Sequence, residues 1–392
     1  MSSRSVVVVG AGTVGLVTGL GLARRGFDVT ILERGTAPAP GPRDVVYHWC
    51  SLPLFADLGM LPAMTSRGVL CPETSVVVLA TGESLRVDLG TLADVTEHPF
   101  NVHVPQDAMA EIATAAVSDI PGSRLLWGVE VTDGRQDSSG ATVRGRSGTE
   151  DLEFRADWVI GADGSKSVVR RSLGLSFAGT TWAKCLVSCD LRFDLATRGH
   201  ANASKQLDPE HGALIAKVSS DGMWRYTSAE TRTLPAEQII DRTEAAVAAA
   251  LGTDDPHIER IVPYRVHQRS ADSFRVGRAV LVGDAAHLTN PTLALGMLSG
   301  LYDAKLLIET LPAVDDLGDE ILDRYAAERY ANFWEVTSPR SSEGMELMYS
   351  PGGPAQLEER VESIREMTAS RDRTRSFLLA DLDCETPLSL DV

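Results

Sequence analysis

Long apolar runs are missing from this sequence of 392 residues, since none reaches the ~18 residues that a membrane-spanning helix needs. The apolar run at residues 5–10 is far shorter, glycines follow it at once, and the N-terminus lacks the pattern of a secretory signal. Basic residues are scarce too, with 37 Lys and Arg against 54 Asp and Glu and a net charge of −17. Nucleic acids and anionic membranes bind clustered Lys and Arg. We therefore expect neither a nucleic-acid nor a membrane partner.

Cysteine pairs with metal-binding spacing are also missing. The five cysteines are an odd number, and no two of them form a CxxC motif. Cys185 and Cys189 lie four residues apart in a strand-like segment, but no further ligands stand near them. We expect no metal site, and we expect buried thiols in a reducing cytoplasm. The chain is long enough for two or three domains with a large core.

The first of three glycine-containing motifs stands near the N-terminus. Val6–Val9 is a β-branched run, as in a strand buried on both faces. Gly10, Gly12 and Gly15 then form GxGxxG, in which the glycines permit a tight turn, close approach of a pyrophosphate and close helix packing. A second predicted strand ends at Glu33, where an acid binds a ribose hydroxyl. The motif therefore predicts a dinucleotide without a 2′-phosphate at this site, such as FAD or NAD.

Two further motifs combine a buried strand with glycine and aspartate. The segment DWVIGA precedes Asp163-Gly164, and the apolar run AVLV precedes Gly283-Asp284. An Asp-Gly pair alone is an ordinary turn, but its combination with Arg170 is much less ordinary. Open α/β sheets bind ligands beyond the carboxyl ends of their strands, so we expect Asp284 at that edge.

Three other positions are candidates with an equally good structural explanation. Arg43 follows a Pro- and Gly-rich loop and is either a clamp for a pyrophosphate or a solvated charge. Gln106 stands at the start of an Ala-rich helix, where its amide either reaches a ligand or begins the helix. His48 lies between Tyr47 and Trp49, and such a row of aromatic residues fits core packing as well as a pocket.

Together these motifs resemble a known family. GAGTVG with Glu33-Arg34, DWVIGADGSKSVVR, and GRAVLVGDAAHLTNP with Asp303-Ala304 are similar to the three fingerprints of the single-component FAD-dependent aromatic hydroxylases. The resemblance covers residues 4–345. It implies an α/β fold like that of para-hydroxybenzoate hydroxylase, with a Rossmann-like FAD-binding domain, a substrate domain on a mostly antiparallel β-sheet, and C-terminal helices. The expected boundaries are residues 1–74, 100–178 and 268–312 for the FAD-binding domain, 75–99 and 179–267 for the substrate domain, and 313–392 for the C-terminal helical segment.

The resemblance also implies which residues contact FAD. The ADP part is expected at Gly10, Gly12, Thr13, Val14, Gly15, Glu33 and Arg34, and the diphosphate and ribose region at Arg43 and Gln106. Asp163 and Gly164 match a motif implicated in binding both FAD and NAD(P)H. The ribityl chain is expected at Asp284, and the flavin ring at Pro291, Gly296 and Met297.

One segment departs from the family pattern. After Pro291 the family usually continues with GGQG and then an asparagine one residue on, but Ala294, Leu295 and Leu298 stand at the Gly, Gln and Asn positions. Each lost hydrogen bond removes about 1 kcal/mol. We expect FAD binding to survive with a looser or more apolar environment around the ring. Either an apolar substrate packs on these leucines, or the chemistry differs, as in a reductase or a cyclase of the same fold.

The family implies a reaction. NAD(P)H reduces FAD, reduced flavin and O₂ form a C4a-hydroperoxide, and an electron-rich ring, phenolic or polyketide-like, attacks its distal oxygen. Candidate bases are Tyr264 and His267, of which strand alternation lets at most one face the ring. Substrate contacts are expected from His48, His211, Tyr226 and Leu295. We expect FAD with NADH or NADPH, an aromatic substrate and O₂, a monomer or homodimer, and a solvated cover from the C-terminal helices. A ligand-binding protein with a relict flavin fold is disfavoured by the intact motifs.

Overall fold

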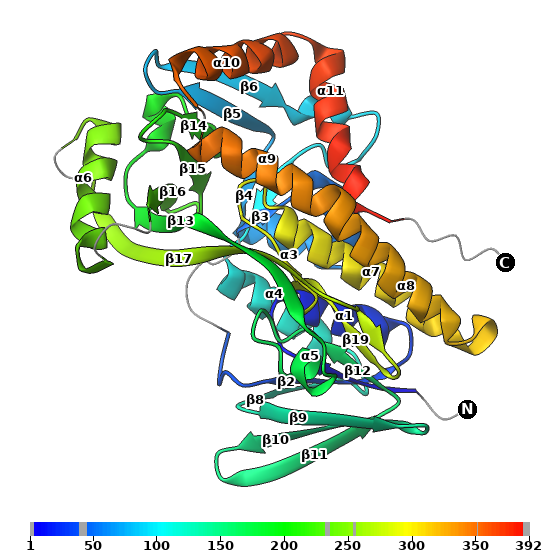
Figure 1. The fold of residues 1–392 in the computed structure, drawn as a ribbon. Helices are drawn as coiled ribbons and strands as arrows, with labels where there is room; N and C mark the ends of the chain where they lie inside the picture. The colour runs from blue at the N-terminus through cyan, green and yellow to red at the C-terminus, as the bar shows by residue number, and fades with distance from the viewer. Residues whose placement is uncertain (1–3, 39–44, 232–235, 254–255, 351, 387–392) are drawn as a thin grey trace.

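The computed structural model describes residues 4–38, 45–231, 236–253, 256–350 and 352–386. In this part of the chain a mostly parallel sheet and a mostly antiparallel sheet form the two halves of the molecule, with helices packed on both (Figure 1). The predicted α/β fold, with a Rossmann-like unit joined to an antiparallel sheet and C-terminal helices, is confirmed.

The first sheet has the strand order β18-β19-β12-β1-β2-β8. Its parallel strands are β1 (Ser5–Val9), β2 (Asp28–Glu33), β8 (Arg124–Trp127), β12 (Trp158–Gly161) and β19 (Ala279–Leu281), and β18 (Arg275–Val276) is an antiparallel edge. Helix α1 (Thr13–Arg24) packs against α4 (Gln106–Ser118) and α7 (Leu295–Leu317). The valines of β1 are all buried, which explains why this strand is apolar without alternation.

The second sheet has the strand order β20-β17-β13-β16-β15-β14-β5-β6. Its strands are β5 (Glu73–Val78), β6 (Glu83–Asp88), β13 (Phe177–Leu191), β14 (Ala203–Leu207), β15 (Ala213–Lys217), β16 (Trp224–Thr231), β17 (Ile258–Ala271) and β20 (His287–Leu288). Neighbours are antiparallel except β5 and β14. Strand β17 crosses the expected boundary between residues 267 and 268, so the division into domains remains a proposal.

Each face of the second sheet has its own helical cover. On one face, α6 (Ile239–Leu251) packs on the core that contains Val187 and Tyr226. On the other, α9 (Ser338–Tyr349) and α10 (Pro354–Thr368) pack on the core that contains Leu186 and Val266. Strand alternation therefore decides which side chains of this sheet lie under α9 and α10.

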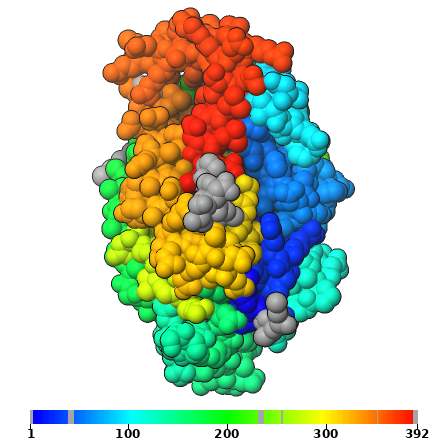
Figure 2. All heavy atoms as spheres, turned by 90° about the vertical axis from the view of Figure 1, so that its right-hand side faces the viewer, coloured from blue at the N-terminus to red at the C-terminus, as the bar shows by residue number. Residues whose placement is uncertain are grey.

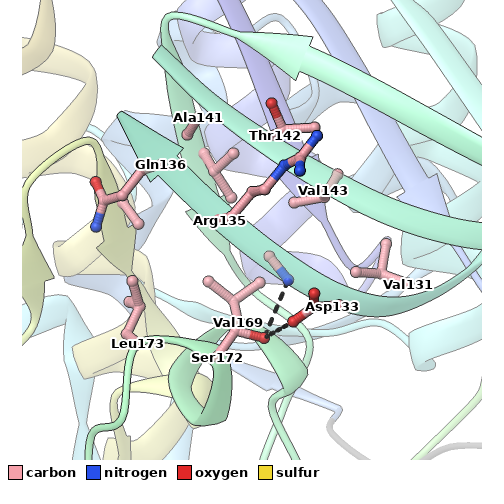
Figure 3. Close-up of a pocket in the computed structure, with 13 residues that line it drawn as sticks. Val131, Asp133, Arg135, Gln136, Ala141, Thr142, Val143, Val169, Ser172 and Leu173 are labelled. Carbon is pink, nitrogen blue, oxygen red and sulfur yellow. Dashed lines mark hydrogen bonds between the residues drawn. The ribbon is translucent and has the colours of Figure 1, made fainter. Parts of the chain in front are cut away.

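Smaller elements complete the fold. One small sheet joins β3 (Val46–Tyr47), β7 (Asn101–His103) and β4 (Val69–Cys71), near helices α2 (Leu52–Asp57) and α3 (Leu61–Arg67). A meander of β9 (Glu130–Asp137), β10 (Gly140–Ser147) and β11 (Glu150–Ala156) meets α5 (Val168–Ser172). The crevice between the meander and α5, in which Ser172 accepts a hydrogen bond from the Gly134 amide, holds about 20 Å³ (Figure 3). That volume admits about one water molecule and no larger ligand.

The C-terminal segment is built into the molecule. It comprises α8 (Glu320–Asn332), a π-helical turn (Phe333–Thr337), α9, α10, α11 (Arg371–Leu379) and a final 3₁₀ turn (Ala380–Cys384). Figure 2 shows α11 lying between the orange C-terminal helices and the blue N-terminal segments. Leu378 and Cys384 are buried against Trp49 and Leu295. The C-terminal helices were expected to form a solvated cover, and this expectation is corrected, because one side of the segment is buried in the hydrophobic core. No helix in the described ranges has the length and apolarity needed to cross a membrane.

Two buried histidines make the stability depend on pH. Burial lowers the pKa of His103 and of His200 to about 4, from about 6.5 in an unfolded chain. The unfolded chain therefore takes up protons between these values while the folded protein does not, so stability is fully present above pH 6.5 and falls toward pH 4. We expect the free energy of unfolding in urea to be about 1–2 kcal/mol lower at pH 5 than at pH 7 for each histidine. His103→Gln should reduce this difference, and a pH dependence equal to that of the wild type would contradict the assignment.

Candidate functional site

The three glycine-containing motifs meet at one edge of the parallel sheet. They follow β1, β12 and β19, which are adjacent strands, and Glu33 ends the neighbouring strand β2. The Ala162 amide donates to the carbonyl of Val9, and the Val282 amide donates to the carbonyl of Gly161. The carboxyl ends of these strands therefore form one continuous edge, where open α/β sheets bind dinucleotides.

The first loop is shaped for a pyrophosphate. Gly10 has φ +107°, a conformation that favours glycine, and a Cβ on Gly15 would overlap the carbonyl oxygen of Gly10. Gly12, the N-cap of α1, has no atom within 4 Å of the position that its Cβ would take. The backbone of Gly12 is thus open to a ligand at the N-terminus of α1, where a helix favours anions.

Glu33 ties this loop to the end of β2. Its Oε2 accepts from the Ala11 amide at 2.9 Å and its Oε1 accepts from the Gly35 amide at 2.9 Å. Each carboxylate oxygen retains a lone pair for a further donor, as a ribose hydroxyl requires. The residues present therefore fit the ADP part of FAD.

The structure places the other residues that were expected to contact FAD in different surroundings. The Oε1 atom of Gln106 is buried with no hydrogen-bond partner among the described residues, which leaves an acceptor for a ligand donor. Thr13 is buried, with Oγ1 3.4 Å from the Tyr47 hydroxyl, and Arg34 is exposed beside Glu33. Arg43 lies outside the described residues.

The second and third motifs are joined by a buried arginine. Arg170 donates to the carbonyls of Ala285 and Ser165, both at 2.8 Å, and its guanidinium lies 3.7 Å from the ring centre of Phe177. Asp163 accepts from the Ser167 hydroxyl and from the amides of α5, which hold its carboxylate in place. Burial raises the pKa of Asp163, and these hydrogen bonds oppose that shift. Gly164 has φ +76° and no neighbour at its Cβ position, so its backbone is accessible.

Ala294 occupies a backbone conformation that glycine prefers. It is the N-cap of α7 with φ +53° and ψ +22°, and it precedes Gly296 and Met297. An alanine in this conformation costs the folded protein about 1 kcal/mol. A glycine would remove that cost, but it would also raise the entropy of the unfolded chain, which offsets part of the gain in stability. We expect Ala294→Gly to raise the free energy of unfolding in urea by up to ~1 kcal/mol, and Ala294→Val to lower it by ~1–2 kcal/mol.

A matched control separates this strain from the general effect of glycine. Ala286 is buried with φ −89°, so Ala286→Gly should destabilise by about 0.5–1 kcal/mol. Equal losses at positions 286 and 294 would show that Ala294 is not strained.

A cavity of about 850 Å³ connects residues 291–297, called here the flavin loop, with the antiparallel sheet. Its walls come from four parts of the chain. The wall contains Asp284 and, from the flavin loop, Pro291, Ala294, Gly296 and Met297; the sheet contributes Ser188, Lys205, Leu214, Arg225, Thr227 and Tyr264; the N-terminal part contributes Val14, His48, Trp49 and Asn101; and the C-terminal segment contributes Arg340, Glu343, Leu347, Ile364, Met367, Leu378 and Asp381.

His48 links the flavin loop to the C-terminal segment across this cavity. Its Nε2 lies 3.0 Å from the Leu293 carbonyl oxygen and its Nδ1 lies 3.2 Å from Asp381. Asp381 also pairs with Arg340 at 3.1 Å. Burial would raise the pKa of Asp381, but the charges and hydrogen bonds of His48 and Arg340 outweigh it and lower that pKa.

Two expected substrate contacts and one candidate base lie outside the cavity wall. His267 lies on the face of β17 opposite to Tyr264, and its Nδ1 lies 2.8 Å from the Thr181 hydroxyl. Tyr226 is buried under α6, where its hydroxyl bonds Gln206 and the carbonyl of His211. The expectations for His267, His211 and Tyr226 are corrected for this reason, whereas the predicted opposition of Tyr264 and His267 is confirmed.

The expectation for Leu295 is corrected as well. Helical spacing puts Leu295, Leu298 and Tyr302 on one side of α7, where they pack against Trp49 and Leu378. The leucines that replace the family's polar residues therefore bury the contact with α11 and do not line the cavity. The expectation that Leu295 contacts a substrate, and that these leucines surround the ring, is not supported by this packing.

Several wall residues were missed by the sequence analysis. Lys205 stands in the centre of β14, where the segment ASKQL alternates too weakly to predict its face. Arg340 and Asp381 reach the cavity only through tertiary packing of the C-terminal helices, and no local pattern identifies them.

Comparison with known proteins agrees with this geometry. The model of the FAD binding domain family matches residues 3–339. The chain is 34% identical to 6-hydroxy-3-succinoylpyridine 3-monooxygenase of Pseudomonas putida (strain DSM 28022 / S16), covering 96% of both chains. It is 32% identical to para-nitrophenol 4-monooxygenase of Pseudomonas sp. (strain WBC-3), covering 95% of this chain and 94% of that protein. The crystal structure of p-nitrophenol 4-monooxygenase from Pseudomonas putida DLL-E4 superposes with a TM-score of 0.93 at 30% identity, covering 98% of this chain and 99% of that one. The chain therefore belongs to the FAD binding domain family and is an FAD-dependent aromatic monooxygenase.

Proposed function

We propose that the protein hydroxylates a phenolic or hydroxypyridine-like single ring, using NADH or NADPH and O₂. The observation that carries this proposal is the uninterrupted cavity from the flavin loop to the antiparallel sheet. When bound, FAD supplies hydride acceptance from NAD(P)H and activation of O₂. The similar proteins named above are monooxygenases of small aromatic rings by name, which favours a single ring over a polyketide.

The protein's own residues would bind FAD, favour negative charge on its ring and exclude water from the substrate. Glu33 and Gly12 would hold the ADP part of FAD, Gln106 would contact its diphosphate and ribose region, and Asp284 would lie beside its ribityl chain. The first amides of α7 lack partners within the helix, so the N-terminus of α7 favours negative charge on the ring. Apolar wall residues such as Leu214 and Met367 exclude water from the substrate.

A non-hydroxylating flavoprotein is a weaker proposal. Its support was the altered segment from Leu293 to Leu298, but Leu295 and Leu298 pack against α11. Their packing against α11 explains why leucines stand at these positions without requiring a different reaction.

The test is steady-state oxidation of NADH and of NADPH by the FAD-loaded protein, with O₂ uptake, in the presence of single-ring phenols and hydroxypyridines. The proposal predicts that one of these rings stimulates oxidation and leaves with one added oxygen atom. Oxidation that no ring stimulates, with all products unchanged in mass, would contradict it.

Tyr264 is the candidate base that lines the cavity. We expect Tyr264→Phe to lower kcat for hydroxylation at least about tenfold with FAD content unchanged, since a positioned proton acceptor contributes about 10²–10⁴-fold. His267→Gln is the matched control, because this side chain lies on the opposite face of the same strand. A kcat for Tyr264→Phe within twofold of the wild type would remove Tyr264 from the mechanism.

A further inference from the structure

Lys205 lies on the floor of the cavity among apolar neighbours. It is the central residue of β14, and it lies opposite Leu214 of β15 and Val76 of β5 in the sheet register. All three residues line the cavity. The ammonium group therefore belongs to the wall that a substrate touches, some 90 residues before the flavin loop in the sequence.

No described acid neutralises Lys205. In the ranges that the structure describes, its ammonium group makes no hydrogen bond and no ion pair within 4.0 Å. Burial lowers the pKa of Lys205, the attraction of Asp381 opposes this shift, and the repulsion of Arg340 adds to it. Lys205 is half-buried and lines the cavity, so a ligand there that carries an anionic oxygen would supply the partner that the described acids do not.

Asp381, Arg340 and Arg225, which also line the cavity, are already paired, and Arg360 donates to the carbonyl of Glu346 at 3.3 Å. Asp381 is shared by His48 and Arg340. Arg225 binds Asp190 through two nitrogens, at 2.8 and 3.2 Å. The acids Glu343 and Glu346 are exposed on α9, at the margin of the cavity. Lys205 thus adds a positive charge that is available to a ligand.

We infer that Lys205 binds an anionic oxygen of the aromatic substrate, either a carboxylate on the ring or the oxygen of an ionised ring hydroxyl. The inference rests on the proposed function, because it names the class of ring that the same cavity takes. Lys205 is then a residue that determines specificity, and uncharged phenols bind more weakly than charged ones.

Equilibrium binding to the FAD-loaded protein tests this inference, followed by the change in flavin absorbance without NAD(P)H. The ligands are 4-hydroxybenzoate, its uncharged analogue 4-hydroxybenzamide, and para-nitrophenol at pH values below and above its ionisation. We expect wild-type protein to bind the benzoate at least about tenfold more tightly than the amide, as a charged hydrogen bond allows. Lys205→Met should remove that preference, and Lys205→Arg should retain most of it.

Matched variants make the outcome decisive. Lys217→Met removes a lysine of the adjacent strand β15 that lies over the Trp224 ring and outside the cavity wall, and it should bind both ligands as the wild type does. Lys205→Gln keeps a polar side chain of similar reach without the charge, so it serves if the methionine variant fails to fold.

Each outcome decides one question. If the affinity for the benzoate depends on Lys205, the carboxylate is the anionic group that it binds. If the affinity for para-nitrophenol depends on Lys205 only at pH values at which the phenol is ionised, the ring oxygen is that group. Equal binding of charged and uncharged ligands, or losses in the Lys205 variants that are the same for both, would overturn the inference. Lys205-dependent binding without hydroxylation of any ring would leave the inference standing and contradict the proposed function.

Discussion

Replacing Gly12 with aspartate is expected to lower the affinity for FAD by at least about 100-fold without destabilising the apoprotein. An added side chain at this position meets no atom within 4 Å, so the fold can accept it. Gly12 is the N-cap of α1, where aspartate is a preferred residue that would raise stability by roughly a few tenths of a kcal/mol. The same carboxylate occupies the helix N-terminus and repels the diphosphate. The measurements are FAD titration of the apoprotein and urea unfolding without FAD.

Gly15→Ala is the contrasting variant in this loop. Its Cβ would overlap the carbonyl oxygen of Gly10, so the loop itself must shift and the apoprotein should lose stability. The two variants therefore distinguish Gly12, whose missing side chain leaves room for the diphosphate, from Gly15, whose missing side chain lets α1 pack closely on the loop. Normal FAD affinity in Gly12→Asp would show that the diphosphate lies elsewhere.

The second large effect is expected from the buried ion pair of Asp303 and Arg329. Arg329 Nε donates to Asp303 at 2.7 Å, both side chains are fully buried, and the other Asp303 oxygen accepts from the Gly283 amide at 2.9 Å. Arg329 also donates to the Cys384 carbonyl at 2.9 Å, which ties the C-terminal turn to the flavin motif. Removing one partner leaves an uncompensated buried charge, so Arg329→Met should lower the free energy of unfolding by about 3–5 kcal/mol.

An exposed pair provides the control. Arg373 lies 2.8 Å from Glu366, and Arg373→Met should change stability by less than about 1 kcal/mol. Burial would raise the pKa of Asp303, but His287 and Arg329 outweigh it and hold that pKa at about 2. The stabilisation from this carboxylate is therefore present above pH 4 and is lost toward pH 2. A loss below 1 kcal/mol for Arg329→Met would mean that the network is not coupled to folding.

Sequence patterns predicted the parts of the site that depend on local chemistry. A β-branched strand, a glycine loop and an acid at the end of the next strand have a physical reason for their spacing, and so does the alternation that separates Tyr264 from His267. These features are set within one βαβ unit or one strand. They required no knowledge of which distant segments pack together.

The substrate side depended on packing that no short segment encodes. Tyr226 and Lys205 lie in one sheet, on β16 and β14 with β15 between them, yet Tyr226 faces α6 and Lys205 faces the cavity. Which face became the cavity was decided by α9 and α10, more than 100 residues later in the chain. Leu295 was misplaced for the same reason, because its partner Leu378 belongs to α11.

The most direct measurement of the central claim is a crystal structure of the protein grown with excess FAD. The account predicts one FAD, with its ribose at Glu33, its diphosphate over Gly12, its ribityl chain at Asp284 and its ring against residues 291–297. Electron density for FAD away from this edge, or an edge closed to FAD while the protein remains folded, would contradict it.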